Sequence, residues 1–572
     1  MSKRSRFWWV LPGIILIGLL LRLWQLDLKP IWLDEVISSL FGLGRNYLDI
    51  PQGQVFPLTT VRQIFSLNPS ATCAQIVETV STQSVHPPLF FCWLHGWAHA
   101  LNFLPLSYLW KLRAFAVFWG CMAIAAVFLL NRSLFSRRAG WFGAAFMAVS
   151  PFAVYLSQEA RHYTLPMVLI TLALLATYHL YRDLQNGQVR WAYWLSWIAI
   201  NSLGFYVHYF FLLAFAAQVV AVTLALWWFP AGFDPAALHK TPKYLLVQLR
   251  QLALLTAAVC LAYLPWLATF ISHITRPETD WMLPTGPKWA QGIAPLYQLP
   301  VGWVAMFITL PVEEQPLWLK LVFGGIMLAF FGWVLTLLVK RLRRLRHAPL
   351  VQPGIRLLGL YLLVVLAEFF VVIYVLGKDL TLVPRYNFIY FPAVCALVGV
   401  GLAVSSESLH PLWKNYRFGL VVLSVATFSS ALVVNDFVFQ KPYYPDVVAQ
   451  DVRAIAETPN LIGVINRNWQ DVALGMSVFL TLEEMERSQP DAQSQIFFIP
   501  RLPEGRTWST LAQLQQPYAA PLRLWLIAPD APRAFFPETL TLPGGDGASL
   551  TCTSTVKQHF RRGIPHRLYQ CS

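Results

Sequence analysis

Charged residues are scarce in this chain. Asp, Glu, Lys and Arg make up 12% of its 572 residues, whereas about 25% is usual for a soluble protein. This scarcity, together with 56% hydrophobic residues and a mean hydropathy of +0.51, predicts a multi-pass membrane protein. The net charge of +15 would favour nucleic acid as the partner of a soluble protein. Here Lys and Arg cluster between apolar runs, as the positive-inside rule requires, so we expect no nucleic-acid partner.

The sequence also lacks closely spaced cysteine motifs and a signal-peptide cleavage site after its first apolar run. The seven cysteines include no CxxC pair and no zinc-like spacing, which argues against a structural metal site. Lys3, Arg4 and Arg6 precede an apolar run at residues 7–21. No small-residue cleavage site follows that run. We therefore expect an uncleaved helix whose N-terminus is cytoplasmic, in a chain without internal repeats or low-complexity segments.

Apolar runs of spanning length predict about eleven transmembrane helices. A span needs about 20 apolar residues. Residues 288–311 are apolar but contain Pro295 and Pro300, and counting them would move the basic cluster at 340–346 outside. We therefore predict an external or re-entrant segment there. The eleven expected spans lie near residues 7–23, 109–131, 139–157, 164–181, 191–207, 210–229, 251–271, 317–339, 356–376, 386–404 and 418–434.

Two regions should lie outside the bilayer. The first is a long outer loop, about residues 24–105, within a membrane domain at 1–434. The second is residues 435–572, where short β-type runs at 461–465, 496–499 and 522–527 alternate with helical stretches at 447–457 and 471–487. This order predicts a small extracytoplasmic α/β domain. Its only cysteines are Cys552 and Cys571, and an outside location permits a disulfide between them.

An adjacent acidic pair, Asp34 and Glu35, stands out in the outer loop. It lies in the apolar, aromatic stretch 30–42, a few residues beyond the first span. Carboxylates so near a bilayer are costly, which favours a functional site. The alternative is an amphipathic helix on the membrane surface whose polar side is acidic.

Further polar residues fall at the outer ends of the expected spans. Each has an ordinary alternative: an interfacial histidine, an arginine reaching the headgroups, or a local Glu159–Arg161 ion pair. Outward arginines nevertheless oppose the positive-inside trend. We therefore predict one site on the outer face that includes Glu35, His86, Arg113, Glu159, Arg161, His208, Tyr209 and Arg385.

Such a set suits group transfer from a lipid-linked phosphate. Arginines can bind the phosphodiester of a polyprenyl-phosphate sugar and stabilise the leaving phosphate. A carboxylate can deprotonate an acceptor hydroxyl. The rival interpretation is a transporter or flippase that performs no chemistry. Transporters tend to have inverted repeats and ionisable residues at mid-membrane, whereas here Glu368 is the one clear acid in the middle of a span.

The motifs resemble those of GT-C membrane glycosyltransferases, specifically the protein-O-mannosyltransferase-like family 39. That family includes dolichyl-phosphate-mannose protein mannosyltransferases and lipid A aminoarabinose transferases. The resemblance covers about residues 1–430. The motifs that carry it are Asp34-Glu35, His86-Pro87-Pro88-Leu89-Phe90, Ser157-Gln158-Glu159-Ala160-Arg161-His162-Tyr163, Tyr206-Val207-His208-Tyr209-Phe210 and Pro384-Arg385-Tyr386.

The resemblance implies an inverting transferase in the plasma (inner) membrane that uses a polyprenyl-phosphate-linked sugar. It gives Asp34 the role of catalytic base and makes His208 the candidate ligand of a divalent metal; no cofactor is certain. The segment 435–572 does not resemble the β-trefoil domain of eukaryotic members. The acceptor is therefore left open as a glycan, a lipid or a protein.

Overall fold

The structure, a computed structural model, falls into two compact units. The helical unit comprises Met1–Leu26, Ser84–Phe90 and Arg113–Phe439, and the sheet unit comprises Asp27–Gln83, Phe91–Leu112 and Gln440–Ser572. Most of the outer loop thus groups with the C-terminal segment, not with the helices that flank it. The described residues are 9–228, 242–284, 286–345, 348–403, 412–441, 443–454, 460–487, 494–503, 505–514, 518, 521–544, 549–556 and 564–572.

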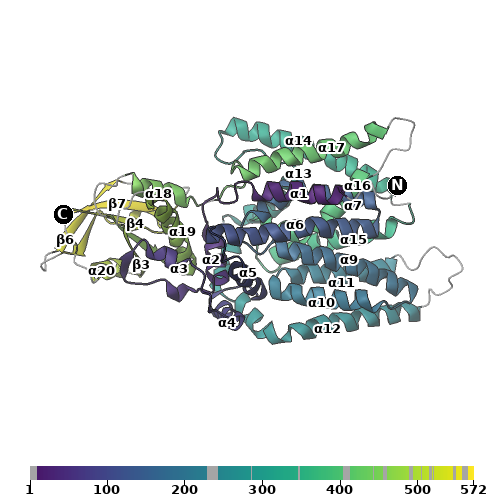
Figure 1. Cartoon of the computed structure of the whole chain (residues 1–572), viewed down its shortest axis with the longest axis horizontal. Helices are drawn as coiled ribbons and strands as arrows, with labels where there is room; N and C mark the ends of the chain where they lie inside the picture. Colours follow the sequence, from purple (N-terminus) through teal and green to yellow (C-terminus); the bar gives the residue numbers. More distant parts are fainter. Residues whose placement is uncertain are drawn as a thin grey trace. The chain divides into compact units, whose positions relative to one another are not determined.

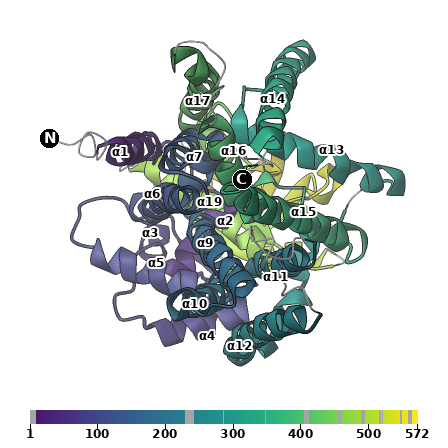
Figure 2. The same cartoon turned by 90° about the vertical axis from the view of Figure 1, so that its right-hand side faces the viewer.

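The helical unit is a bundle in which α9 lies beside both α10 and α11 (Figure 2). Two short 3-10 helices, η3 (Pro277–Met282) and η4 (Pro384–Ile389), lie in its connections. Its α-helices are α1 (Val10–Leu23), α6 (Tyr108–Leu134, whose first five residues belong to the sheet unit), α7 (Arg137–Val149), α8 (Pro151–Ser157), α9 (Thr164–Asn186), α10 (Trp191–Val207), α11 (Phe211–Trp228), α12 (Pro242–Ile274), α13 (Lys288–Phe307), α14 (Leu317–Leu345), α15 (Gln352–Tyr374), α16 (Phe391–Ala403) and α17 (Leu412–Val434).

Seven helices in the described part of the chain are long and apolar enough to cross a membrane, or eight if the bent pair α7–α8 is one span. The expected eleven are therefore not confirmed. Expected spans at 7–23, 191–207 and 386–404 correspond to the shorter helices α1, α10 and α16. The segment 288–311 is largely helical as α13 and is not among the seven. The basic residues Lys3, Arg4 and Arg6 lie outside the described residues.

Small residues bring two helices of this bundle unusually close. A Cβ added at Gly399 of α16 would lie 2.7 Å from the Gly143 Cα of α7. Without a Cβ at either position, the two backbones can approach directly, as small residues allow between membrane helices. Asn131 lies beside both glycines and donates a hydrogen bond to the Ala139 carbonyl oxygen.

The sheet unit contains helices from both ends of the sequence. Figure 1 shows α18 and α19, from the C-terminal segment, beside the strands. Its helical elements are α2 (Leu33–Gly42), η2 (Tyr47–Asp49), α3 (Thr60–Ile64), α4 (Cys73–Gln83), α5 (Leu89–Ala100, whose first two residues belong to the helical unit), α18 (Pro445–Arg453), α19 (Trp469–Glu486), α20 (Arg506–Ala512) and η5 (Arg533–Phe535).

The sheet has seven strands among the described residues, in the order β1-β3-β2-β4-β7-β6-β5. The central β3-β2-β4 strands are parallel, and the flanking pairs are antiparallel. The expected β-type runs are the strands β2, β3 and β4. Their sequences are continuously apolar because a parallel sheet is covered on both faces. The bounds are β1 (Val55–Pro57), β2 (Asn460–Asn466), β3 (Gln495–Pro500), β4 (Leu522–Ile527), β5 (Thr539–Pro543), β6 (Ser549–Val556) and β7 (His566–Cys571).

Two disulfides lie in the sheet unit. Cys552 and Cys571 are bonded across the neighbouring strands β6 and β7, the pairing that the sequence analysis allowed. The sequence analysis did not foresee the second bond, which joins Cys73 of α4 to Cys92 of α5. Edge strand β1 was also unforeseen. It comes from the outer loop and pairs antiparallel with β3.

Candidate functional site

The segment Ser157–Tyr163 joins the short helix α8 to α9, and α8 itself follows a sharp bend in the chain. Helices α7 and α8 meet at Ser150 with a bend of 58°. A break of this kind exposes the last carbonyl groups of the preceding helix. Arg22 of α1 provides hydrogen bonds to these carbonyl groups. Its guanidinium donates to the Ala148 carbonyl oxygen at 2.8 Å and to that of Met147 at 3.0 Å.

The same buried arginine fixes the start of the segment. Arg22 Nε donates to Ser157 Oγ at 3.0 Å. The neighbouring Gln158 Nε2 donates to the Trp24 carbonyl oxygen at 2.9 Å. The chain beyond α8 is therefore tied to the C-terminal end of α1 before it reaches the predicted site residues Glu159 and Arg161, both of which are buried.

Three histidine rings form a row in the helical unit. The His86 and His162 ring centroids lie 4.7 Å apart, and those of His162 and His208 lie 4.5 Å apart. The predicted residues His86 and His208 are thus brought together by a histidine that we had not selected. His162 lies inside the motif quoted for the resemblance, three residues after Glu159, so that motif contained the signal.

Two arginines stand close to this row. Burial lowers the pKa of His162 well below its ordinary value, and the nearby charges of Arg161 and Arg385 lower it further. Burial likewise lowers the pKa of His208, which also lies near Arg161. His162 and His208 are therefore neutral at pH 7, and the two guanidinium groups carry positive charge. An anion is the ligand that such a site would attract.

The histidine row does not fit a metal ion. Among the described residues, no group of three or more His, Cys, Asp or Glu side chains is arranged to hold one. In addition, His208 Nδ1 accepts a hydrogen bond from the Phe210 N–H at 3.0 Å. In the neutral ring the proton is then on Nε2, whereas a metal ligand needs an unprotonated nitrogen.

Two other predicted residues make contacts away from the row. The Arg113 guanidinium of α6 is buried and donates to the Leu26 carbonyl oxygen at 2.8 Å. The Tyr209 hydroxyl lies 2.6 Å from His273 Nδ1 and accepts from Trp266 Nε1 at 3.0 Å. These contacts direct Tyr209 toward α12.

The acidic pair belongs to the sheet unit. Asp34 and Glu35 lie in the first turn of α2, where the helix dipole favours negative charge. Glu35 is fully buried, whereas Asp34 is half-buried. Just before the helix, the Trp32 ring lies 4.0 Å from Lys441 Nζ. The predicted site residues are thus divided between the two units.

The chain resembles known membrane transferases. The family described as dolichyl-phosphate-mannose-protein mannosyltransferase matches residues 85–266. The structure of ArnT from Cupriavidus metallidurans in the apo state matches with a TM-score of 0.50 and 12% identity, over 98% of this chain and 97% of that one. Together they confirm the predicted resemblance to GT-C glycosyltransferases, and the ArnT match shows a shared fold.

Two further solved structures are similar at lower scores. ArnT from Cupriavidus metallidurans bound to undecaprenyl phosphate has a TM-score of 0.49 and 12% identity, over 99% of this chain and 98% of that one. AglB from Archaeoglobus fulgidus, in complex with an inhibitory peptide and a dolichol-phosphate, has a TM-score of 0.40 and 14% identity, over 83% and 64%. No sequence among curated proteins matches this chain.

Proposed function

We propose that this chain is an integral membrane inverting glycosyltransferase. It transfers a sugar from a polyprenyl-phosphate-linked donor to a hydroxyl of a glycan, lipid or protein acceptor on the extracytoplasmic side. The observation that carries the proposal is the pair Arg161 and Arg385 beside neutral histidines, since permanent cations in a largely buried setting favour a phosphate. The fold shared with ArnT, a protein also solved with undecaprenyl phosphate, is consistent with this donor.

In the proposed reaction Arg161 and Arg385 hold the donor phosphate. The acceptor hydroxyl gives its proton to the Asp34 carboxylate as its oxygen attacks the anomeric carbon. The bond from that carbon to the phosphate oxygen breaks, and polyprenyl phosphate leaves as an anion stabilised by the arginines. Attack opposite the leaving group inverts the anomeric configuration.

The remaining predicted residues support or line this site. In this proposal Glu159 and the rings of His86 and His208 contact the sugar and phosphate of the donor. Glu35, fully buried next to the base, fixes the first turn of α2. Arg113 and Tyr209 act through the helix contacts described above.

A transfer assay tests the proposal directly. Purified protein is incubated with radiolabelled undecaprenyl-phosphate pentoses and hexoses, with envelope membranes as the source of acceptors. We expect label to leave the polyprenyl phosphate and become bound to an acceptor. If labelled donor instead moves intact across a proteoliposome membrane and no sugar is released, the protein is a transporter and the proposal is wrong.

The membrane orientation is part of the proposal. The basic end of α14, near Arg344, is placed in the cytoplasm and Ser572 outside. The disulfides Cys73–Cys92 and Cys552–Cys571 favour an oxidising compartment for the sheet unit. Reporter fusions at Arg344 and Ser572 should report opposite sides. Signals from the same side at both positions would contradict this orientation.

A further inference from the structure

Helix α2, which carries Asp34 and Glu35, is supported by the C-terminal part of the chain. Within the sheet unit it packs along α19, and α3 contacts α19 as well. Arg62 of α3 forms an ion pair with Glu483 of α19, across 421 residues of sequence. The C-terminal α/β segment therefore forms part of the support of the acidic helix.

A row of aromatic rings joins the two segments. Tyr47 stacks on Trp469, the first residue of α19, with ring centroids 5.0 Å apart and planes inclined by 14°. Tyr47 also contacts Phe41 of α2 edge-on, with ring centroids 5.7 Å apart. Phe41 in turn contacts Phe91 of α5 at 5.5 Å. Tyr47, Phe41 and Phe91 are all buried, so movement of Trp469 would be transmitted to α2.

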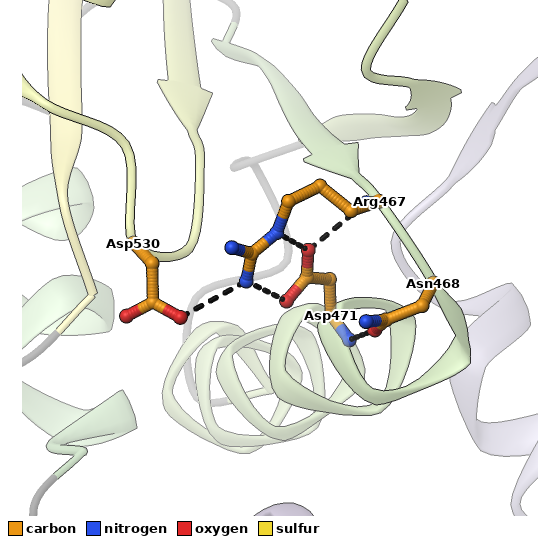
Figure 3. Close-up of polar contacts among 4 residues, drawn as sticks. All are labelled: Arg467, Asn468, Asp471 and Asp530. Carbon is orange, nitrogen blue, oxygen red and sulfur yellow. Dashed lines mark hydrogen bonds and ion pairs between the residues drawn. The ribbon is translucent and has the colours of Figure 1, made fainter. Parts of the chain in front are cut away.

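Trp469 is itself fixed by polar contacts around the start of α19 (Figure 3). The Asn468 side chain caps the helix by accepting from the Asp471 N–H at 3.0 Å. The Asp471 carboxylate accepts from Arg467 Nε at 2.8 Å and from Nη2 at 3.0 Å. Arg467 Nη2 also donates to Asp530, which follows β4, at 2.9 Å.

These contacts link the sheet to the ring stack. Arg467 follows the carboxyl end of β2, and Asp530 lies beyond the end of the neighbouring strand β4. Their ion pair therefore ties two adjacent strands to the first turn of α19. The Arg467–Asp471 contact is bidentate, which fixes direction as well as distance.

We propose that Trp469 is a positioning residue for the Asp34 carboxylate, acting through Tyr47 and Phe41 on α2. The C-terminal α/β segment thereby participates in the transfer step without touching the donor. This inference rests on the proposed function, because it assigns Asp34 the role of base. A misplacement of about 1 Å can cost about 100-fold in rate, so loss of the ring should reduce turnover while donor binding is retained.

The test compares two tryptophans of the sheet unit in the full-length protein. Trp508 of α20 is partly buried like Trp469 and packs on Phe535, with ring centroids 5.1 Å apart. We expect Trp469→Ala to lower kcat about 10- to 100-fold, with undecaprenyl phosphate binding within about twofold of wild type. Trp469→Phe, which keeps a stacking ring, should restore most of the rate. Trp508→Ala should leave kcat unchanged.

Trp469→Leu is a second variant that keeps apolar volume and removes the stack, in case the alanine variant does not fold. It should show the same loss of kcat. The inference is overturned if a folded Trp469→Leu or Trp469→Ala protein retains wild-type kcat, or if Trp508→Ala loses as much rate as they do.

A double variant separates this inference from the proposed function. If Trp469 acts through Asp34, replacing it in an Asp34→Asn protein should lower the residual rate no further. Additive losses would mean that Trp469 acts by another route, and the positioning role would be wrong. Near-wild-type turnover in Asp34→Asn alone would instead remove Asp34 as the base, whatever the behaviour of Trp469.

Discussion

The two units position their polar residues in different ways. In the helical unit, the histidine row and its arginines come from connections between helices, such as the break before α9 and the α10–α11 turn. In the sheet unit, Asp34 lies on the short helix α2, which packs against α19, more than 400 positions later in the sequence. One half of the proposed site thus depends on where membrane helices end, and the other on tertiary pairing.

The difference suggests that the two units have different roles in the proposed reaction. The helical unit offers positive charge and neutral rings, which suit a phosphate, whereas the acidic pair is in the sheet unit. Donor binding should therefore respond to changes in the helical unit, and proton transfer to changes in the sheet unit. The predictions below test that separation, beginning with the largest effect.

Replacing the proposed base should give the largest loss. Asp34→Asn keeps the size of the side chain but cannot accept the proton, so turnover should fall about 100- to 10,000-fold. Binding of undecaprenyl phosphate should survive, because the arginines lie in the other unit. Glu35→Gln is the matched neighbour and should have a milder effect. Equal losses of turnover and of donor binding in Asp34→Asn would contradict the assignment of donor binding and proton transfer to different units.

The second prediction concerns stability. Changing both Cys73 and Cys92 to Ser removes a crosslink of sequence separation 19, which should cost the sheet unit about 3 kcal/mol in unfolding free energy. Thermal unfolding with proteolytic mapping would show which unit opens first. The free cysteine Cys260 of α12 provides the control, as Cys260→Ser. If both units lost the same stability in the Cys73/Cys92 variant, they would unfold in a single cooperative transition.

The third prediction concerns the donor phosphate. Arg161→Ala or Arg385→Ala should remove a charged hydrogen bond worth about 1.5–3 kcal/mol, equivalent to about 10- to 150-fold weaker binding of undecaprenyl phosphate. Lysine at either position would restore charge without bidentate geometry. Arg341→Ala in α14 is the control, since its guanidinium contacts the Gly401 carbonyl and Phe418. Unchanged affinity in both site variants would make these arginines structural.

The last prediction concerns the pH dependence of stability that the two buried histidines of the helical unit contribute. The pKa values of His162 and His208 are lowered in the folded protein, so the unfolded chain binds more protons below about pH 6.5. Stability should consequently fall as pH drops from 7 to 5, by up to about 1.4 kcal/mol per pH unit for each histidine. His162→Gln should flatten the slope, and His99→Gln, at an exposed position, should not. A wild-type slope in His162→Gln would show that His162 does not contribute.

Local patterns predicted the parts of the molecule that depend on local structure. The span at 164–181 is α9, the β-type runs are strands β2, β3 and β4, and the predicted residues His86, Arg161, His208 and Arg385 do gather in one unit. His162 was missed although it lies in a quoted motif, because the charged residues Glu159 and Arg161 of that motif were selected in its place. Arg22 was missed because a basic residue at the end of a span is ordinarily an interfacial anchor.

Features that depend on distant contacts could not be predicted in the same way. Nothing in the alternation of Val55–Pro57 indicates that it pairs with β3, because a three-residue strand takes its register from its partner. The Cys73–Cys92 bond likewise depends on α4 and α5 lying together. The span count was uncertain because α1, α10 and α16 are short and the α7–α8 span is bent.

The composition of the sheet unit has a consequence for biogenesis. Strand β1 and helix α2 are synthesised early, whereas their partners β3 and α19 emerge more than 400 residues later. During that interval the segment that carries them has an unpaired strand edge and an uncovered apolar helix face, a setting in which chaperones commonly act. A nonsense mutation near the 3′ end of the gene, which removes β3 and α19, would therefore leave β1 and α2 without their partners although these are translated first.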